Sequence, residues 1–405
     1  MHRPRIVILG AGYGGIMTTK QLQKLLAPGE AEVTLVNKHD YHYFTTNLHL
    51  SAAGSEHPDQ LRVPIKTLLS PERTSFKKAH AIKVLPDEQV VLLKDGTLPY
   101  DYLVIAVGAK SETFGIPGLK QHALTIQSLN RVRYIYRHIR LQFATYKNKG
   151  SIHDDLLTIV IGGAGLTGIE FVGELMEQVP LLCKEFDIDP AKVNVYCVQS
   201  STQLLSPGFD PELVQHAKLT LSLKGVRFKL SAAIQSCSEH GVQLANGEFI
   251  PAKTIVWTGG IQGNYLLNDS GFPTVRGRVQ VQPSLQTISH PNIFIIGDCS
   301  IFETPSGEIF PPTAQIAIQQ GYACATNLVS LLRNKQPARF DPQIKGTVAS
   351  IGKGEAVGMI GDWSIKGPIA SLVKKFIDLR YIYLLGGVKL IIKKKVLSLT
   401  NNYRD

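Results

Sequence analysis

The chain has 405 residues, 44% of them hydrophobic, so it is long enough to form two or three domains with buried cores. Its formal net charge of +11 at pH 7 favours an acidic partner, such as nucleic acid, an anionic membrane or a phosphorylated cofactor. The five cysteines show no C-x-x-C pair and no metal-ligand spacing, so we expect reduced thiols, no disulfide framework and no metal site.

An apolar strand followed by a glycine-rich turn begins the chain. The strand is predicted over residues 6–9, and Gly10, Gly12 and Gly15 then occupy the places of the motif G-x-G-x-x-G. The first glycine of this motif permits a tight bend, the second lets the backbone approach a pyrophosphate, and the third lets the helix pack on the strand. The apolar run lacks a small-residue cleavage site, so we interpret it as a strand rather than a signal peptide.

A second strand is predicted over residues 32–36, after a helix that ends near Leu26. Asn37 follows it at the position where an acid normally holds the adenosine ribose, and an amide can still bond the 2′-hydroxyl. The segment 41–49 is rich in aromatic and hydroxyl side chains, which suits the wall of a flat ring. A partly buried surface loop is the alternative.

Two further apolar strands end in glycine turns. They are predicted over residues 102–107 and 255–258, and Gly108, Gly259 and Gly260 follow them. We expect both strands to return beneath a bound nucleotide, although ordinary strand ends would have the same pattern.

A second glycine-rich turn has the same strand-to-helix context as the first. Gly163, Gly165 and Gly168 occupy the motif places, and the helix that follows is expected to end near Cys183. One such motif alone is weak evidence. Two of them predict one prosthetic and one exchangeable dinucleotide, with two purely structural turns as the alternative.

The ribose position of the second motif carries an amide. The strand 193–198 is followed by Gln199, Ser200 and Ser201. A carboxylate there would bond both ribose hydroxyls of NADH and repel the 2′-phosphate of NADPH, whereas this neutral segment supplies donors. We therefore expect NADPH to be tolerated. An NADH enzyme whose ribose is held by an amide is the open alternative.

A buried strand is predicted to end at Asp298, whose carboxylate can bond a ribityl hydroxyl or a phosphate-side group of a flavin cofactor, with an isolated Gly-Asp turn as the alternative. The prolines at 311–312 then open a predicted helix, on which Gln315 and Gln319 share a face. A helix N-terminus aimed at a flavin stabilises its anionic reduced form, and the glutamines offer donors to a carbonyl substrate. A capped helix with a polar face is the alternative.

The segment 366–395 combines apolar helical runs with eight basic residues and one acid, Asp378. Such runs bordered by lysines are typical of helices that lie in the headgroup layer of an anionic membrane. We expect membrane binding without a transmembrane helix, with a dimer or interdomain helix pair as the alternative. Because the charge gathers in this tail, we expect no nucleic-acid partner.

Together these features resemble the type II NADH dehydrogenases, which are single-subunit NADH:quinone oxidoreductases, and particularly those of Gram-positive bacteria. The motifs that carry the resemblance lie at 10–15, 36–43, 162–171, 297–298 and 314–319. The last, Ala-Gln-Ile-Ala-Ile-Gln, is similar to the quinone-site signature of that family.

The resemblance implies an α/β fold, with two Rossmann-like dinucleotide-binding domains and a C-terminal membrane-anchoring domain. We expect a discontinuous FAD-binding domain over residues 1–113 and 278–330, an NAD(P)H-binding domain over 114–277 and the anchoring domain over 331–405. It also implies non-covalent FAD, a homodimer and a peripheral position on the cytoplasmic face of the cell membrane.

Site residues follow by position. Gly12 and Gly15 are expected to support the FAD pyrophosphate, while Thr46 flanks the isoalloxazine. The full set of expected cofactor-binding residues is Gly10, Gly12, Gly14, Gly15, Asn37, Lys38, Thr46, Gly108, Gly163, Gly165, Thr167, Gly168, Glu170, Gln199, Ser200, Gly259, Gly260, Asp298, Ala314 and Gln315. The expected quinone-binding residues are Gln315, Ile316, Gln319, Lys375 and Tyr383, and the expected catalytic residues are Glu170, Gln315 and Gln319.

The expected reaction is hydride transfer from NADH, or NADPH, to FAD and two-electron reduction of a membrane quinone, by resemblance menaquinone, without proton pumping. Two positions depart from the family pattern. Glutamate is usual at Gln199 and often stands at Leu50, and nothing in the sequence explains the second change.

Three other functions compete with this one. Sulfide:quinone oxidoreduction needs paired redox cysteines, which the chain lacks. A soluble reductase of a ferredoxin-type acceptor, or a redox-sensing flavoprotein without enzymatic activity, would leave the basic apolar tail unexplained.

Overall fold

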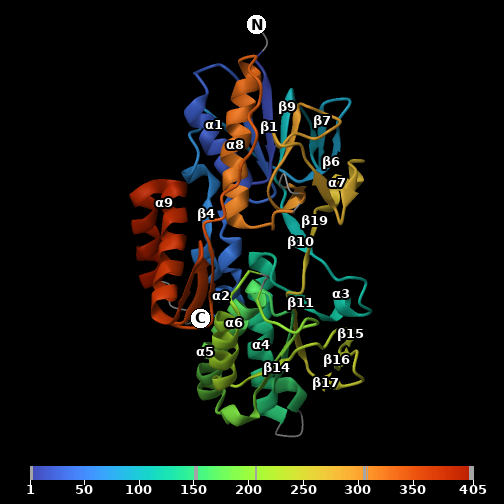
Figure 1. Ribbon diagram of the computed structural model, residues 1–405, viewed down its shortest axis with the longest axis vertical. Helices are drawn as coiled ribbons and strands as arrows, with labels where there is room; N and C mark the ends of the chain where they lie inside the picture. Colours follow the sequence, from blue (N-terminus) through green and yellow to red (C-terminus); the bar gives the residue numbers. More distant parts are fainter. Residues whose placement is uncertain (1–2, 150–153, 206–207, 304–306, 308, 401–405) are drawn as a thin grey trace. The chain divides into compact units, whose positions relative to one another are not determined.

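The computed structural model describes residues 3–149, 154–205, 208–303, 307 and 309–400, and the chain forms two compact units (Figure 1). Unit 1 comprises Met1–Tyr43, Arg62–Lys110 and Ile261–Ile344. Unit 2 comprises Phe44–Leu61, Ser111–Gly260 and Lys345–Asp405. The division into three domains that we expect from the sequence stays a prediction.

Unit 1 is built on a parallel sheet with the strand order β22-β9-β1-β2-β5. Its strands are β22 (Ile293–Ile295), β9 (Tyr102–Ile105), β1 (Arg5–Leu9), β2 (Glu32–Asn37) and β5 (Ser75–Lys78). The side chains of β1 from Ile6 to Leu9 are almost completely buried, as expected for a strand covered on both faces.

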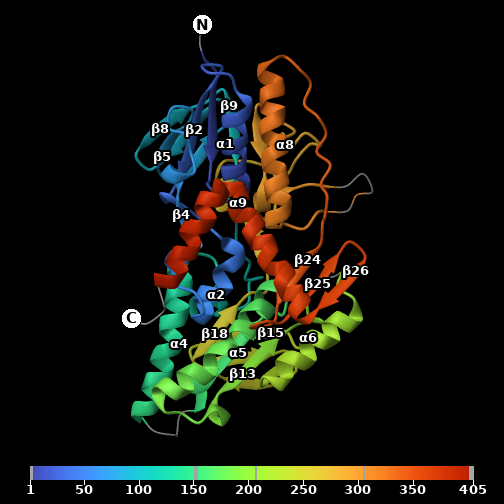
Figure 2. The same ribbon diagram turned by 90° about the vertical axis from the view of Figure 1, so that its left-hand side faces the viewer.

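Two helices of unit 1 pack closely side by side, α1 (Tyr13–Leu25) and α8 (Ala314–Leu332) (Figures 1 and 2). A Cβ atom on Gly321 of α8 would lie 2.7 Å from the carbonyl oxygen of Gly14 on α1, so the glycine permits this approach. The N-cap of α8 is Thr313, whose hydroxyl accepts a hydrogen bond from the N–H of Ile316. The prolines at 311–312 therefore precede the helix instead of forming its first turn, which corrects the prediction.

Smaller elements complete unit 1. They are β3 (Tyr41–Tyr43), β4 (Arg62–Pro64), β6 (Ala81–Leu85), β7 (Val90–Leu93), β8 (Gly96–Pro99), α7 (Tyr265–Asp269), β20 (Thr274–Val275), β21 (Arg278–Gln280) and β23 (Ser300–Ile301). Strands β10 (Ala109–Ser111) and β19 (Ile261–Gly263) form a two-stranded sheet.

Unit 2 repeats the architecture with a parallel sheet of order β11-β18-β12-β13-β14. Its strands are β11 (Leu124–Thr125), β18 (Thr254–Trp257), β12 (Thr158–Gly162), β13 (Asn194–Val198) and β14 (Val226–Lys229). Its helices before the C-terminal segment are α2 (Leu48–Ala53), α3 (Leu119–His122), α4 (Leu129–Lys149), α5 (Leu166–Phe186) and α6 (Pro211–Leu223).

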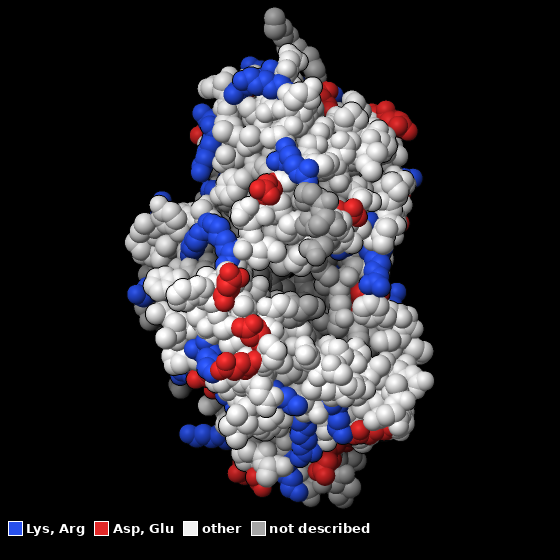
Figure 3. All heavy atoms as spheres, viewed as in Figure 1, with Lys and Arg blue, Asp and Glu red and all other residues white. Residues whose placement is uncertain are grey.

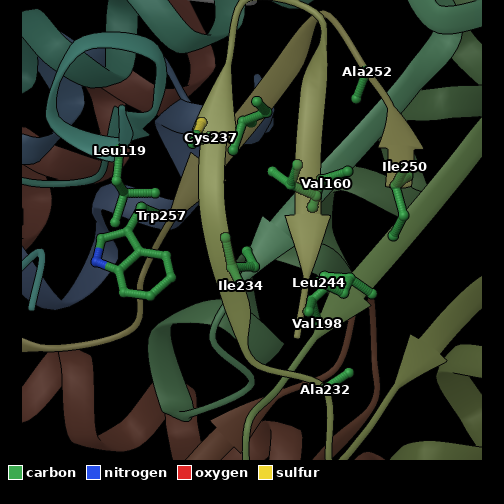
Figure 4. Close-up of a cluster of buried hydrophobic side chains, with 12 residues drawn as sticks. Leu119, Val160, Val198, Ala232, Ile234, Cys237, Leu244, Ile250, Ala252 and Trp257 are labelled. Atoms are coloured by element: carbon green, nitrogen blue, oxygen red, sulfur yellow. The ribbon is translucent and has the colours of Figure 1, made fainter. Parts of the chain in front are cut away.

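Two antiparallel sheets also belong to unit 2. Their strands are β15 (Ile234–Ser238), β16 (Gly241–Leu244), β17 (Phe249–Pro251), β24 (Thr347–Ser350), β25 (Ala356–Ile360) and β26 (Trp363–Lys366). The sheet β15-β16-β17 packs on the parallel sheet through a buried cluster in which Val160, Leu244 and Ile250 lie close together (Figure 4). The indole N–H of Trp257 donates to the carbonyl oxygen of Glu112 at 2.7 Å, so its polar atom is satisfied at the edge of this core.

The C-terminal helix α9 (Gly367–Thr400) is broken at Gly386 and Gly387, and Figure 2 shows it as two helical segments with a bend. Gly387 has φ 63° and ψ −163°, a conformation that favours glycine. This bend interrupts the apolar helical pattern that we predicted within 366–395. Tyr381 and Leu385 before the bend and Leu390 after it are buried. Within the described part of the chain, no helix is both long and apolar enough to span a bilayer.

Candidate active site

The first glycine-rich turn joins β1 to α1 in unit 1. Gly10 has φ +100°, and a Cβ on it would lie 2.4 Å from the carbonyl oxygen of Ala106. A Cβ on Gly15 would lie 1.9 Å from the carbonyl oxygen of Gly10, so only glycine lets α1 begin this close to the turn. By contrast, a Cβ on Gly12 would meet its nearest neighbour only at 4.0 Å.

The second turn joins β12 to α5 in unit 2 and has the same geometry. Gly163 has φ +103°, and a Cβ on Gly168 would lie 2.0 Å from its carbonyl oxygen. A Cβ on Gly165 would find no atom within 4 Å. The hydroxyl of Thr258, which the sequence did not single out, donates to the carbonyl oxygens of Gly162 and Gly163 at 3.1 and 2.9 Å and fixes the shape of the turn.

An amide side chain closes each turn in the same way. Asn37 Oδ1 accepts a hydrogen bond from the N–H of Ala11 at 3.1 Å, and Gln199 Oε1 accepts one from the N–H of Ala164 at 2.9 Å. The other end of the Gln199 amide donates to Ser201 Oγ at 2.9 Å. Both predicted ribose positions thus lie beside their turns, and both are neutral.

These two turns fit the phosphates of dinucleotides. In each, the second glycine borders open space, and the helix that follows presents unpaired backbone N–H groups at its first turn. Thr167 is exposed in the first turn of α5. His42, a residue that we did not predict, is fully buried, and its Nδ1 lies 2.8 Å from the carbonyl oxygen of Ala11, which supports the first turn from strand β3.

The loop after β22 holds the predicted ribityl-binding residue, Asp298. Burial raises the pKa of this carboxyl, although the positive charge of Arg278 partly offsets the rise. Gln320 of α8, which we did not predict, is 1% exposed and holds this loop in place. Its Oε1 accepts a hydrogen bond from the N–H of Gly297 at 2.6 Å, and its Nε2 donates one to Ser300 Oγ at 3.3 Å. A small cavity borders this loop and the N-terminus of α8, lined by Arg278, Gly297, Ser300, Phe310, Thr313 and Gln320.

The two glutamines of the predicted quinone motif lie on α8, as do Ala314 and the buried Ile316. The Gln319 side-chain amide makes two hydrogen bonds to the backbone of Gln343. Its Oε1 accepts from the N–H of Gln343, and its Nε2 donates to the carbonyl oxygen of Gln343, each at 2.9 Å. Nε2 also donates to the carbonyl oxygen of Gln315 at 3.3 Å. The quinone-binding role of both glutamines stays a prediction.

Other predicted site residues lie in both units. In unit 1, Lys38 is exposed just after β2, and Gly108 follows β9 with φ +68°. In unit 2, Thr46 is exposed and its hydroxyl donates to Asn47 Oδ1 at 2.9 Å. Ser200 is exposed beside Gln199. Gly259 and Gly260 follow β18, where a Cβ would collide with the rings of Trp257 and Phe114.

Glu170, on α5 of unit 2, lies in a buried cluster of charged and polar side chains. Its Oε1 lies 2.6 Å from Lys374 Nζ and accepts from the backbone N–H of Ser350 at 3.3 Å. Its Oε2 lies 3.6 Å from Nδ1 of His49 on α2. One turn after Lys374 on α9, Asp378 Oδ2 accepts from Asn47 Nδ2 at 3.3 Å.

Opposing effects set the protonation of this cluster. Burial alone would raise the pKa of Glu170, but the charge of Lys374 and the hydrogen bonds from Lys374 and from the N–H of Ser350 outweigh it and hold that pKa below its usual range. Burial lowers the pKa of His49 and so favours the neutral ring. Burial also raises the pKa of Asp378, against the attraction of Lys374 and the hydrogen bond from Asn47. The cluster therefore favours an ionised Glu170 and a neutral His49, and it raises the proton affinity of Asp378.

The sequence singled out Lys375 and Tyr383 on α9, and both are exposed. The lysine that reaches Glu170 is its neighbour Lys374, with a side chain 19% exposed. The sequence indicated that a lysine lies among apolar residues at helical spacing in this segment. It did not indicate which of the two adjacent lysines, Lys374 or Lys375, faces inward.

Three of the eight basic residues of 366–395 are bound within unit 2. Lys366 pairs with Glu212 at 2.5 Å, Lys374 pairs with Glu170, and Lys394 donates to the carbonyl oxygen of Gln60. The remaining five are exposed, namely Lys375, Arg380, Lys389, Lys393 and Lys395. On the face seen in Figure 3, Lys and Arg are interspersed with Asp and Glu.

An apolar stripe runs along the first segment of α9. Its residues recur at intervals of three and four and are exposed, namely Ile369, Leu372, Phe376, Leu379 and Tyr383. Val388 and Ile392 are exposed after the bend. Exposed apolar side chains in such an array mark an interaction surface.

All five cysteines lie in the described part of the chain, and each is buried and free. Burial raises the pKa of the Cys197 and Cys299 thiols to about 12, which disfavours the thiolate. Neither can serve as the reactive thiolate of a disulfide-based redox site.

Comparisons with known proteins agree with this architecture. Residues 4–321 match the family described as pyridine nucleotide-disulphide oxidoreductase. The type II NADH:quinone oxidoreductases of the Staphylococcus aureus strains MSSA476 and NCTC 8325 / PS 47 are each 40% identical to this chain over 397 residues, which covers 97% of this chain and 98% of the relative.

Solved structures share the fold at lower identity. NDH2 from Plasmodium falciparum, solved in complex with NADH, superimposes with a TM-score of 0.87 at 19% identity and covers 98% of this chain and 97% of its own. The sulfide:quinone oxidoreductase from Aquifex aeolicus superimposes with a TM-score of 0.77 at 22% identity, and the match covers 98% of this chain and 95% of the Aquifex chain.

Proposed function

This chain belongs to the pyridine nucleotide-disulphide oxidoreductase family and, within it, to the type II NADH:quinone oxidoreductases, and from this membership we propose its detailed reaction. The enzyme oxidises NADH, and accepts NADPH, at the turn of unit 2. It holds FAD non-covalently at the turn of unit 1, and it reduces a membrane quinone, menaquinone by preference. Electron transfer proceeds without proton pumping.

The observation that carries this proposal is the pair of equivalent turns. Each has a left-handed first glycine, an open second glycine, a third glycine packed on the turn and an amide that accepts from the turn backbone. Two such turns on two separate parallel sheets suit two dinucleotides. When bound, the flavin would accept a hydride from the nicotinamide nucleotide and pass two electrons on to the acceptor.

The residues of unit 1 have distinct roles in holding FAD. The backbone at Gly12 and the N-terminus of α1 bind the pyrophosphate, Asn37 bonds the ribose, and Asp298 bonds the ribityl chain. Gln320 of α8 holds the loop that contains Asp298 through its hydrogen bonds to Gly297 and Ser300. The N-terminus of α8 places positive helix-dipole potential where negative charge develops on the reduced ring.

Gln199 allows both nicotinamide nucleotides. Its Oε1 is occupied by the N–H of Ala164, so the side chain presents its NH₂ end and the hydroxyls of Ser200 and Ser201 to the ribose. This arrangement carries no negative charge that would repel a 2′-phosphate. It also holds no arginine that would demand one, so NADH remains a substrate.

Sulfide is not the electron donor in this proposal. That chemistry needs a pair of reactive cysteines, whereas the cysteines here are buried and widely separated in sequence. The structural likeness to a sulfide:quinone oxidoreductase therefore concerns the fold alone.

The exposed stripe of α9 and its five exposed cations bind the cytoplasmic face of the cell membrane. Phe and Leu side chains insert into the interface, and each cation adds about 1 kcal/mol at an anionic surface. Membrane binding brings the enzyme to its lipid-soluble quinone. The functional enzyme is a homodimer, as the motif resemblance implies.

Two measurements test this function. Chromatography of the cofactor released by denaturation should identify FAD, and FMN or no flavin would contradict the assignment. Purified enzyme added to anionic vesicles that contain menaquinone should oxidise NADH only when the quinone is present. Equal rates without quinone would indicate a different acceptor.

A further inference from the structure

Two side chains hold the first glycine-rich turn, and both bind the backbone of Ala11. Asn37 Oδ1 accepts a hydrogen bond from the N–H of Ala11 at 3.1 Å. Nδ1 of His42 lies 2.8 Å from the carbonyl oxygen of Ala11. A carbonyl oxygen can only accept a hydrogen bond, so Nδ1 of His42 carries a proton and is the donor. Ala11 is 4% exposed, and its buried carbonyl group needs such a donor from the protein.

The fold fixes the imidazole of His42 in this position. His42 is fully buried in the middle of β3, which pairs with β4. The ring of Tyr13, the first residue of α1, meets the imidazole edge to face, with the ring centroids 5.5 Å apart and the ring planes at 88°. The donor therefore reaches the turn from a paired strand and a packed ring.

The hydrogen bond from His42 also sets the direction of the next N–H group. The peptide group that joins Ala11 to Gly12 is planar and trans, so its carbonyl and its N–H point in opposite directions. Because the carbonyl points at His42, the N–H of Gly12 points away from it. Within the described residues this N–H makes no hydrogen bond, and Gly12 borders open space. It is an available donor at the start of α1, where the helix dipole favours an anion.

The second turn holds the equivalent peptide group without a side-chain donor. The carbonyl oxygen of Ala164 accepts from the backbone N–H of Leu205 at 2.8 Å, while the N–H of Ala164 donates to Gln199. The two turns thus share one arrangement but differ in this donor, which is an imidazole in unit 1 and a backbone N–H in unit 2. A substitution of His42 should therefore change the first turn and spare the second.

We propose that His42 is a positioning residue of the cofactor site, whose Nδ1–H holds the Ala11 carbonyl and so directs the Gly12 N–H at the pyrophosphate of FAD. This inference rests on the proposed function, which puts FAD at this turn. His42 acts through Ala11 and not by contact with the cofactor. Its loss should weaken the binding of FAD and leave nucleotide binding by unit 2 intact.

Three substitutions separate the donor from the bulk of the ring. His42→Asn places its amide nitrogen where Nδ1 lies, His42→Gln places it near the position of Nε2, and His42→Phe keeps a ring without a donor. The holoenzyme is diluted, and the fluorescence of released FAD gives the Kd. We expect this Kd to rise about tenfold to 100-fold in His42→Phe and His42→Gln, because a buried acceptor loses its donor, and to change less than about threefold in His42→Asn.

Two controls accompany these variants. His290→Phe makes the same replacement before β22, at the opposite end of the parallel strands from the turn, and should retain FAD like the wild type. ADP-ribose, the part of NADH that the second turn would hold, is titrated into the holoenzyme by calorimetry. Its affinity should be equal in the wild type and in His42→Phe.

The outcomes separate the two proposals. Equal FAD affinity in the wild type and all three variants would overturn the role of His42, and so would a His42→Asn variant as weak as His42→Phe. Loss of ADP-ribose binding in His42→Phe would also overturn it, because the defect would then reach beyond the first turn. If the wild type itself binds no FAD or no ADP-ribose, the proposed function is wrong.

Discussion

Lys374 Nζ lies 2.6 Å from Glu170 Oε1, and this contact joins the C-terminal helix α9 to helix α5, which begins at the second glycine-rich turn. Glu170 is one turn into α5, so the segment that carries the exposed apolar stripe is bonded directly to the nucleotide-binding helix. The contact therefore fixes the first segment of α9 against helix α5 of the second turn.

Replacing Lys374 by Met should destabilise the protein by about 3–5 kcal/mol at neutral pH, because Glu170 would remain as a buried carboxylate without its partner. The lowered pKa of Glu170 contributes stability above its unfolded-state value of 4.5, and this contribution is lost as pH falls through the folded pKa. The defect should therefore shrink in acid. Thermal unfolding across pH measures it, with Lys375→Met, at the exposed neighbour, as the control; equal losses in both variants would contradict the pairing.

Alanine at the third glycine of each turn should separate the two cofactors. A Cβ on Gly15 or Gly168 would lie about 2 Å from a carbonyl oxygen, so the start of the following helix must shift. Gly15→Ala should be purified with little FAD. Gly168→Ala should keep its FAD but lose about 100-fold in kcat/KM for NADH. Absorbance spectra and steady-state rates measure both, and loss of flavin in Gly168→Ala would contradict the assignment of the second turn.

Gln199→Glu should abolish the acceptance of NADPH that we propose and leave an enzyme specific for NADH. The carboxylate can keep the bond from the N–H of Ala164, but it would repel the 2′-phosphate of NADPH. The ratio of the NADPH to the NADH bleaching rate should fall by at least about tenfold. An unchanged ratio would mean that another residue sets the preference between NADH and NADPH. Gln199→Leu is the control, because it removes the amide without adding a charge.

Glu56→Gln should stabilise the protein in a pH-dependent way. Burial raises the pKa of Glu56 from 4.5 to about 7, despite the nearby charge of Lys394, so ionisation of this group opposes folding. The stability advantage of the variant should be near zero below pH 4.5, grow between pH 4.5 and 7, and reach about 3 kcal/mol above that range. Glu88→Gln, at an exposed glutamate, should show no such trend, and a flat difference for Glu56→Gln would contradict its burial.

Phe376→Asp should weaken membrane binding. Phe376 is 61% exposed at the centre of the apolar stripe, and removal of one large side chain from the interface costs about 1.5–3 kcal/mol, or roughly tenfold to 100-fold in affinity. Sedimentation with anionic vesicles measures the loss. Leu223→Asp, at an 80% exposed leucine that ends α6, should bind like the wild type. Equal binding by Phe376→Asp would move the membrane contact elsewhere.

Local patterns predicted the nucleotide-binding elements well. The glycine spacing, the apolar strands around it and the ribose positions are all set within about 35 residues of chain, and β1, α1, β2, β12, α5 and β13 lie within a few residues of their predicted places. The glycines of both turns have the backbone and packing that the motif requires.

Contacts between distant segments could not be predicted in the same way. Lys374 and Lys375 differ by about 100° around one helix, and only the packing of α9 decides which of them meets Glu170. Gln319 bonds a loop residue, Gln343, that has no periodic signal of its own. The bend at Gly386 and Gly387 was hidden because the apolar pattern continues across it.

Stopped-flow spectroscopy of the bound flavin gives the most direct test of a nicotinamide-to-quinone electron path. The enzyme is mixed anaerobically with NADH or NADPH and then with a soluble menaquinone analogue. We expect rapid bleaching by both nucleotides and rapid, complete reoxidation by the quinone. Bleaching without reoxidation by the quinone would contradict the proposed acceptor and would leave the α9 stripe as a surface for another partner.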